Sequence, residues 1–279
     1  MKTFFALLLA VFCCAILCAK EAPDAIVPYK TVNGEELKLH IFYPENFDVK
    51  EKRPLVLMYH GGGWRAGSPE AFYPHCRYFS NLGYVAISAT YRLCPAEKPQ
   101  NTPFHCLEDA KSAIRYMKKH ASEFGIDPDK IITSGSSAGG QLAIGVAVLD
   151  EVNDPSDDTS ISPIPAGIIL YCPVLNAGPD GYQPIYRRIT DNYKPFSPIH
   201  NLEGKKLPPQ IILIGDFDHV IPVPQAKKYQ EICTSQNAPC EVEVFPGAKH
   251  GAFYGDKFRE LSTPKVKAFL EKHNLLPQL

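Results

Sequence analysis

The sequence has almost no net charge, no internal repeat and, beyond its first twenty residues, no long apolar run. Its 29 Lys and Arg residues face 30 Asp and Glu residues, so no basic excess is available to neutralise phosphates and a nucleic-acid-binding protein is disfavoured. No later segment approaches the roughly 20 apolar residues that span a bilayer. No Asn-x-Ser/Thr sequon signals N-glycosylation. The chain has 279 residues, of which 45% are apolar. This length and composition are typical of a globular protein with a sizeable core.

The first 19 residues have the pattern of a secretory signal peptide. A positive start at Lys2 precedes an uncharged apolar stretch over residues 4–17, and the small Ala19 precedes the charged Lys20. This stretch is too short to span a membrane. We therefore expect cleavage after Ala19 and secretion, to an extracellular or a periplasmic compartment. A lipid-modified Cys18 is the alternative. Residues 20–279 are predicted to form a single domain.

Six of the nine cysteines lie after this segment. An even number in an exported chain permits disulfides. Cys233 and Cys240 flank a short turn and are the first predicted pair. Cys94 and Cys106 flank a Pro-rich loop and are the second. Cys172 lies in an apolar run, which predicts a buried free thiol.

Short apolar runs alternate with helical stretches along the chain, which predicts a doubly wound, mostly parallel α/β sheet with helices on both faces. Residues 27–43 should add one or two antiparallel strands at the start. A last helix is expected to begin at Ser262 or Thr263, with Pro264 in its first turn. The predicted strands are residues 55–59, 84–89, 131–134, 167–171, 211–214 and, near a sheet edge, 241–245; the earlier helices are residues 69–81, 106–123, 138–149 and 222–236. Residues 176–198 form a long excursion, predicted to be a small lid.

The segment Gly135-Ser136-Ser137-Ala138-Gly139 lies between a predicted strand and a predicted helix. This is the context of a G-x-S-x-G nucleophile elbow, in which small residues permit a tight, strained turn. The turn would raise the hydroxyl of Ser137 above the sheet. The backbone N–H of Ala138, at the positive end of the helix, would then face a developing oxyanion. A simple strand-to-helix turn of small residues is the alternative.

A second glycine-rich segment, His60-Gly61-Gly62-Gly63-Trp64, also follows a predicted strand. The segment has the pattern of the oxyanion loop that accompanies a nucleophile elbow. Consecutive glycines in such a loop let backbone amides approach a substrate closely. A phosphate-binding loop is disfavoured because the Lys-Ser/Thr pair is missing. Trp64, the only tryptophan, is expected to border the substrate pocket, with plain packing as the alternative.

A serine nucleophile needs a base and an acid that orients it, and this fold supplies them in the chain order Ser, Asp or Glu, His. Asp216 and Asp218 follow one late strand. His250 is the only histidine between the last predicted strand and the final helix, so it is the predicted base.

These motifs resemble those of the α/β-hydrolase superfamily, in particular its BD-FAE-like and hormone-sensitive-lipase-like esterases. The resemblance rests on HGGGW at 60–64, TYRL at 90–93, GSSAGGQLA at 135–143, GDFDHVIP at 215–222 and GAKHGAF at 247–253, and covers nearly all of residues 50–275. It implies that Asp218 is the acid, with Asp216 as second choice, and that Gly62 and Gly63 join Ala138 in the oxyanion hole. It also implies a structural ion pair between Arg92 and Asp109.

Two departures from the family pattern stand out. Only about 40 mature residues precede the oxyanion loop, so the large helical cap of many relatives is not expected. Ser136 replaces the aspartate that many relatives have before the nucleophile.

The resemblance implies a serine carboxylesterase that hydrolyses short-chain esters through an acyl-enzyme. Export favours acetyl or feruloyl esters on carbohydrates as substrates. No cofactor is expected, and no metal, because the histidine-cysteine pairs at 75–76 and 105–106 lack ligand spacing. A prolyl-oligopeptidase-like peptidase and a non-catalytic binding protein on the same scaffold are the two alternatives.

Overall fold

The structure is a computed structural model that describes residues 22–277. The predicted signal peptide lies outside the described residues. The strands are β1 (Ala25–Val32), β2 (Glu35–Phe42), β3 (Arg53–Tyr59), β4 (Val85–Ala89), β5 (Ile126–Ser136), β6 (Gly167–Tyr171), β7 (Gln210–Gly215) and β8 (Cys240–Phe245). The α-helices are α2 (Tyr73–Asn81), α3 (Pro103–Lys119), α4 (Ala138–Val148), α5 (Gln183–Ile189), α6 (Val223–Ser235) and α7 (Asp256–Lys272). Short 3-10 turns are η1 (Pro69–Phe72), η2 (Thr190–Phe196), η3 (Pro198–His200) and η4 (Ala252–Tyr254).

The eight strands form one sheet in the order β1-β2-β4-β3-β5-β6-β7-β8. β1 and β2 are an antiparallel pair, β2 joins β4 antiparallel, and every later pairing is parallel. The predicted doubly wound sheet is therefore confirmed, as are the antiparallel start and the edge position of β8. Because β3, β5, β7 and β8 are parallel, the loops that follow them all emerge at one edge of the sheet.

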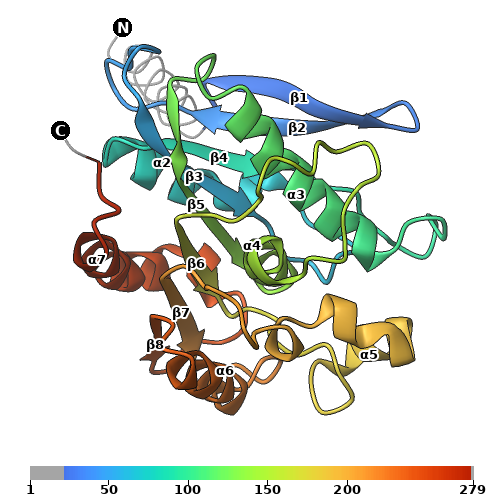
Figure 1. Ribbon diagram of the computed structural model, residues 1–279. Coiled ribbons are helices and arrows are strands. Elements are labelled where there is room, and N and C mark those ends of the chain that lie inside the picture. The colour runs from blue at the N-terminus through green and yellow to red at the C-terminus, as the bar shows by residue number, and fades with distance from the viewer. Residues whose placement is uncertain (1–21, 278–279) are drawn as a thin grey trace, which may run out of the picture.

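Helices cover both faces of the sheet (Figure 1), and alternate side chains of each strand enter one of two cores. On β3, Leu55 and Leu57 enter the core beneath α3, α4 and α6, whereas Val56 and Met58 enter the core beneath α2 and α7. All four side chains are fully buried. Burial on both faces explains why the central strands are apolar at every position rather than at alternate ones.

The last helix begins earlier than the sequence predicts. α7 starts at Asp256, and Pro264 lies inside it rather than in its first turn. The proline removes one backbone donor, a cost that packing can offset. Phe258, in the first turn, packs edge-on against Phe253 with ring centroids 6.2 Å apart, so helical structure ahead of the proline brings a half-buried aromatic ring onto the core.

The predicted disulfides are wrong for this structure, in which all six cysteines of the described chain are free thiols. The Sγ atoms of Cys94 and Cys106 lie 4.0 Å apart, about twice the length of an S–S bond. Each thiol instead lies 3.0 Å from a backbone carbonyl, that of Trp64 for Cys94 and that of Arg92 for Cys106. Cys233 and Cys240 are likewise unbonded neighbours between α6 and β8. Cys172 is a buried free thiol, as predicted.

The predicted ion pair between Arg92 and Asp109 is confirmed. The guanidinium contacts both carboxylate oxygens at 2.7 and 2.8 Å, and the Asp109 side chain is fully buried. Lys30 and Asp154 extend this pair into a network, with Lys30 Nζ 2.8 Å from Asp109. The network joins β1, the TYRL segment after β4, α3 and the loop after α4.

The excursion after β6 carries α5, η2 and η3. It extends away from the sheet on the side of α6 (Figure 1). Within residues 22–277, the helices lack the length and apolarity to cross a bilayer.

Candidate active site

Ser137 occupies the turn between β5 and α4 in a strained backbone conformation. Its φ and ψ are 55° and −117°, a region that residues with a side chain enter at a cost of about 1–3 kcal/mol. The N–H of Ser137 donates to the carbonyl of Tyr171 at 2.9 Å, which holds the turn against β6. Gly139 is required because a Cβ there would lie 2.0 Å from the carbonyl oxygen of Tyr59. Local sequence thus dictates the predicted elbow.

His250 and Asp218 meet Ser137 from loops that follow β8 and β7. The Nε2 atom of His250 lies 2.9 Å from the Oγ of Ser137, and its Nδ1 atom lies 2.8 Å from Oδ2 of Asp218. A carboxylate can only accept a hydrogen bond, so Nδ1 carries the proton and Nε2 is left as an acceptor for the serine hydroxyl. The arrangement can deprotonate Ser137.

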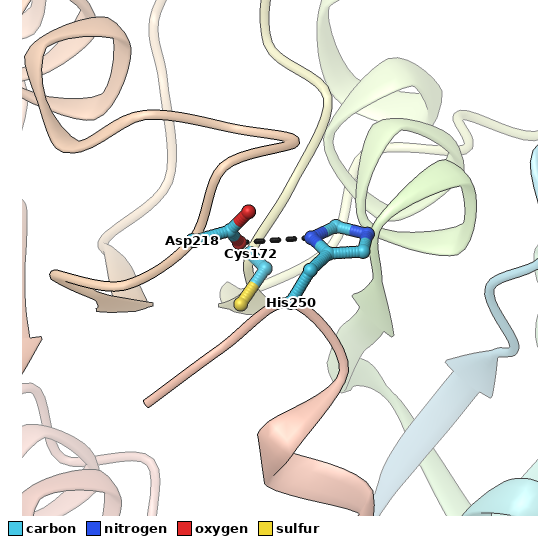
Figure 2. Close-up of side chains that lie close together, drawn as sticks. All are labelled: Cys172, Asp218 and His250. Carbon is cyan, nitrogen blue, oxygen red and sulfur yellow. Dashed lines mark hydrogen bonds and ion pairs between the residues drawn. The ribbon is translucent and has the colours of Figure 1, made fainter. Parts of the chain in front are cut away.

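The carboxylate of Asp218 is buried and accepts hydrogen bonds from His250 (Figure 2) and from the backbone N–H groups of Val220 and Ile221. Burial alone would raise its pKa, but the hydrogen bonds from His250 and from the N–H groups of Ile221 and Val220 outweigh burial and lower the pKa. Asp218 therefore stays ionised beside His250. Asp216, the second choice, is exposed and accepts the N–H of Gly247 at 2.7 Å, so it is not brought to the histidine.

The thiol of Cys172, which sequence analysis assigned only to the core, also lies near this carboxylate. The residue follows β6 with φ of 44°, and burial, together with the negative charge of Asp218, raises the pKa of its thiol. Cys172, Asp218 and His250 each present one atom able to ligate a metal, all within 4.8 Å of one another (Figure 2).

The predicted oxyanion groups lie beside Ser137 with their donors open. Gly62 and Gly63 have φ of 119° and 61°, values that favour glycine. Within the described residues, the N–H groups of Gly62, Gly63 and Ala138 donate to no acceptor. Ala138 is the first residue of α4, where such N–H groups have no partner inside the helix. Open amides beside a nucleophile can bind a developing negative charge.

Tyr254 is a site residue that sequence analysis missed. Its hydroxyl accepts the N–H of Gly61 at 2.8 Å and also bonds to Ser136. It therefore ties the oxyanion loop to the residue before the nucleophile, at the position where many relatives have an aspartate. The only signal in the sequence was its place four residues after His250.

A cavity of about 290 Å³ opens directly from the oxyanion loop. Gly62, Gly63 and Trp64 line one side of it, and Tyr182 and Ile185, from the excursion after β6, line the other. Trp64 borders this cavity as predicted, although only 1% of its surface is exposed.

Packing holds the indole of Trp64 from two sides. Its Nε1 donates to Gln141 Oε1 at 3.2 Å, and its rings pack edge-on against Phe196 at 5.4 Å between centroids. Both interpretations of Trp64, pocket and packing, therefore hold, and the tryptophan is a rigid wall.

Two protein-family models match different parts of the chain. The BD-FAE model matches residues 39–163, which include the oxyanion loop and Ser137. The prolyl oligopeptidase family model matches residues 181–275, which include Asp218 and His250.

Solved structures and curated proteins also resemble the chain. A propionate-bound esterase of Thermogutta terrifontis is 34% identical, with a TM-score of 0.82 over 90% of this chain and 95% of that one. The probable carboxylic ester hydrolase LipM of Mycobacterium tuberculosis is 28% identical over 70% of this chain and 48% of its own length. Endo-1,4-beta-xylanase B of Butyrivibrio fibrisolvens is 28% identical over 75% of this chain and 34% of its own. The chain thus spans less than half of either curated relative.

Proposed function

The chain belongs to the α/β-hydrolase carboxylesterases, and on that basis we propose that it is a secreted serine esterase that cleaves short-chain esters. The observation that carries this proposal is the unbroken line of hydrogen bonds from Ser137 through His250 to Asp218. It lies beside backbone amides that have no other acceptor in the described residues. An activated hydroxyl next to open amide donors is the combination that acyl transfer requires.

In the first half-reaction, Nε2 of His250 takes the proton of Ser137 while Oγ attacks the ester carbonyl. The N–H groups of Gly62, Gly63 and Ala138 bind the oxygen on which negative charge develops. His250, now an imidazolium, is stabilised by Asp218 and gives its proton to the departing alcohol. An acyl-enzyme on Ser137 remains.

In the second half-reaction, His250 takes a proton from water, which attacks the acyl-enzyme. The same three amides hold the second oxyanion, and collapse of the intermediate returns the proton to Ser137 and releases the acid. The chain's own residues supply every proton transfer, so the proposed reaction uses no cofactor.

Two observations support a short acyl group, and two favour carbohydrate esters. The cavity at the oxyanion loop holds about 290 Å³, the low end of the range for small-molecule sites. The esterase of Thermogutta terrifontis was solved with propionate bound. A relative is named as a xylanase, and the signal-peptide pattern points to a substrate outside the cell. We propose acetyl esters on carbohydrates, and feruloyl esters as the related alternative.

A prolyl-oligopeptidase-like peptidase is the second candidate, because that family's model matches residues 181–275. The match covers the acid and the base, which esterases and peptidases of this fold share. The oxyanion loop lies in the segment matched by the BD-FAE model, which favours the esterase.

The test is hydrolysis of p-nitrophenyl acetate, butyrate, octanoate and palmitate by the mature chain, with a prolyl p-nitroanilide alongside. We expect kcat/KM to peak at acetate or butyrate and to fall at least roughly 10⁴-fold in Ser137→Ala. Ser235→Ala, an exposed serine whose hydroxyl bonds only within its own helix end, is the matched control. Anilide cleavage without ester cleavage would establish the peptidase instead. A folded chain that cleaves neither would refute catalysis.

Secretion is tested separately. We expect the full chain expressed with its own first 19 residues to appear outside the cytoplasm with Lys20 as its N-terminus. Retention of the intact N-terminus in the cytoplasm would contradict the proposed export.

A further inference from the structure

Two arginines face the cavity beside the oxyanion loop. Arg65 follows Trp64 in the loop, and Arg188 comes from α5 in the excursion after β6. Both line the cavity that Gly62 and Gly63 also line. A Cβ on Gly61, the residue before these two glycines, would lie 3.3 Å from Cβ of Ser137, so the oxyanion loop runs from the proposed nucleophile to the cavity.

Neither arginine has a carboxylate partner. Among the described residues, no ion pair includes Arg65 or Arg188, and no acidic side chain lines the cavity. One nitrogen of Arg188, Nη2, lies 2.9 Å from the carbonyl oxygen of Cys94 and 3.2 Å from its Sγ. This contact occupies Nη2, the nitrogen that both two-point faces of a guanidinium share, and leaves Nη1 and Nε each available for a single charge-assisted hydrogen bond to a carboxylate.

A second hollow on the molecule shows the opposite arrangement. It is lined by Lys30 and Arg115, but Lys30 pairs with Asp109 at 2.8 Å and Arg115 with Asp157 at 2.7 Å. There the chain supplies its own counter-charges. At the cavity beside the oxyanion loop it supplies no carboxylate, although open amides and the N-terminus of α4 already make that region positive.

We propose that Arg188, assisted by Arg65, forms an anion subsite that favours ester substrates bearing a carboxylate near the scissile bond. The inference rests on the proposed esterase function and narrows its substrate class. The carboxylate can belong to the alcohol part, as in an acetylated uronic acid, or to the acyl part, as in a dicarboxylic acid monoester. In either case it lies within the cavity and accepts from the guanidinium of Arg188.

The experiment measures kcat/KM for two matched substrate pairs. O-acetylated glucuronic acid and O-acetylated glucose differ by a carboxylate on the alcohol part. The p-nitrophenyl monoester of succinic acid and p-nitrophenyl butyrate differ by a carboxylate on the acyl part. The readout is the anionic-to-neutral ratio of kcat/KM, in wild type, Arg188→Gln, Arg65→Gln and Arg187→Gln. Arg187 is the control, because it is the exposed neighbour of Arg188 that does not line the cavity.

We expect the ratio for at least one pair to fall roughly 10- to 100-fold in Arg188→Gln, as for loss of a charge-assisted hydrogen bond. A smaller fall is expected in Arg65→Gln and none in Arg187→Gln. The wild-type ratio should also fall as salt rises, because the arginines are exposed and exposed charges are screened. The pair that responds identifies which part of the ester carries the anion.

Two outcomes overturn the inference and leave the esterase intact: a ratio unchanged by Arg188→Gln in both pairs, or an equal fall in Arg187→Gln. If wild type cleaves none of the four esters, the proposed function itself fails. The neutral members of each pair therefore separate the two failures.

Discussion

Replacing Asp218 with asparagine should abolish most activity without altering the shape of the site. In the structure, Oδ1 of Asp218 accepts the N–H groups of Val220 and Ile221 at 2.9 and 2.8 Å, while Oδ2 accepts Nδ1–H of His250. Asparagine has a single side-chain oxygen, and the two backbone donors compete for it with His250.

The backbone donors win this competition. Turning the amide to face His250 with its oxygen would aim the NH₂ group at the N–H groups of Val220 and Ile221, at about 1–3 kcal/mol for a buried donor left unpaired. The substituted side chain would therefore present its NH₂ group to His250, which must then accept at Nδ1 and carry its proton on Nε2. In that tautomer Nε2 cannot accept the proton of Ser137. We expect kcat to fall roughly 10³- to 10⁴-fold, or about 4–5.5 kcal/mol in barrier.

The measurement is kcat and KM on p-nitrophenyl butyrate for Asp218→Asn, with thermal unfolding to check the fold. KM should change little, because Asp218 does not face the cavity. Asp216→Asn is the matched control, two residues away and exposed, and should keep kcat within about threefold, as expected of a surface substitution. An Asp218→Asn enzyme within tenfold of wild type would refute this reasoning, as would an equal loss in the control.

Three further predictions concern the supports of the site and of the fold. Gly139→Ala should prevent folding, because its Cβ would lie 2.0 Å from a backbone oxygen, whereas Gly255→Ala, whose nearest atom would lie at 3.5 Å, should keep the wild-type yield of soluble protein. Tyr254→Phe should lower kcat about 10-fold at constant KM, since Gly61 loses its acceptor, and an unchanged kcat would remove Tyr254 from the site. The third prediction concerns Asp154. Burial raises the pKa of its carboxyl, but hydrogen bonds from Lys30 and Ser156 outweigh burial and hold that pKa below its usual value. Its stabilisation is present above about pH 4 and is lost as pH falls toward the lower folded pKa, so urea unfolding of Asp154→Asn should depend less on pH in that window.

The sequence alone determined the elements whose geometry is local. Small residues around Ser137 force a tight turn, and a strained turn between a buried strand and a helix has few other uses. Continuous apolar runs required a sheet covered on both faces, and parallel strands bring the loops after β3, β5, β7 and β8 to one edge. The chain order of Ser137, the aspartates and His250 then sufficed to name the residues that the structure brings together.

Local pattern misled where packing competed with it. Pro264 indicated a helix start, yet α7 begins ahead of the proline, where Phe258 packs on Phe253. The spacing of Cys94 and Cys106 suggested a disulfide, yet each thiol has a backbone carbonyl at 3.0 Å.

Only the tertiary structure decided which groups act across space. Asp216 and Asp218 are the same residue type two positions apart. The loop after β7 turns Asp218 toward His250 and leaves Asp216 exposed. Tyr254 reaches Gly61 across 193 positions of sequence, and Arg188 reaches Cys94 across 94. The physical reason is that a turn depends on neighbours in the chain, whereas the occupants of a cavity depend on how distant strands and helices pack, which no local pattern encodes.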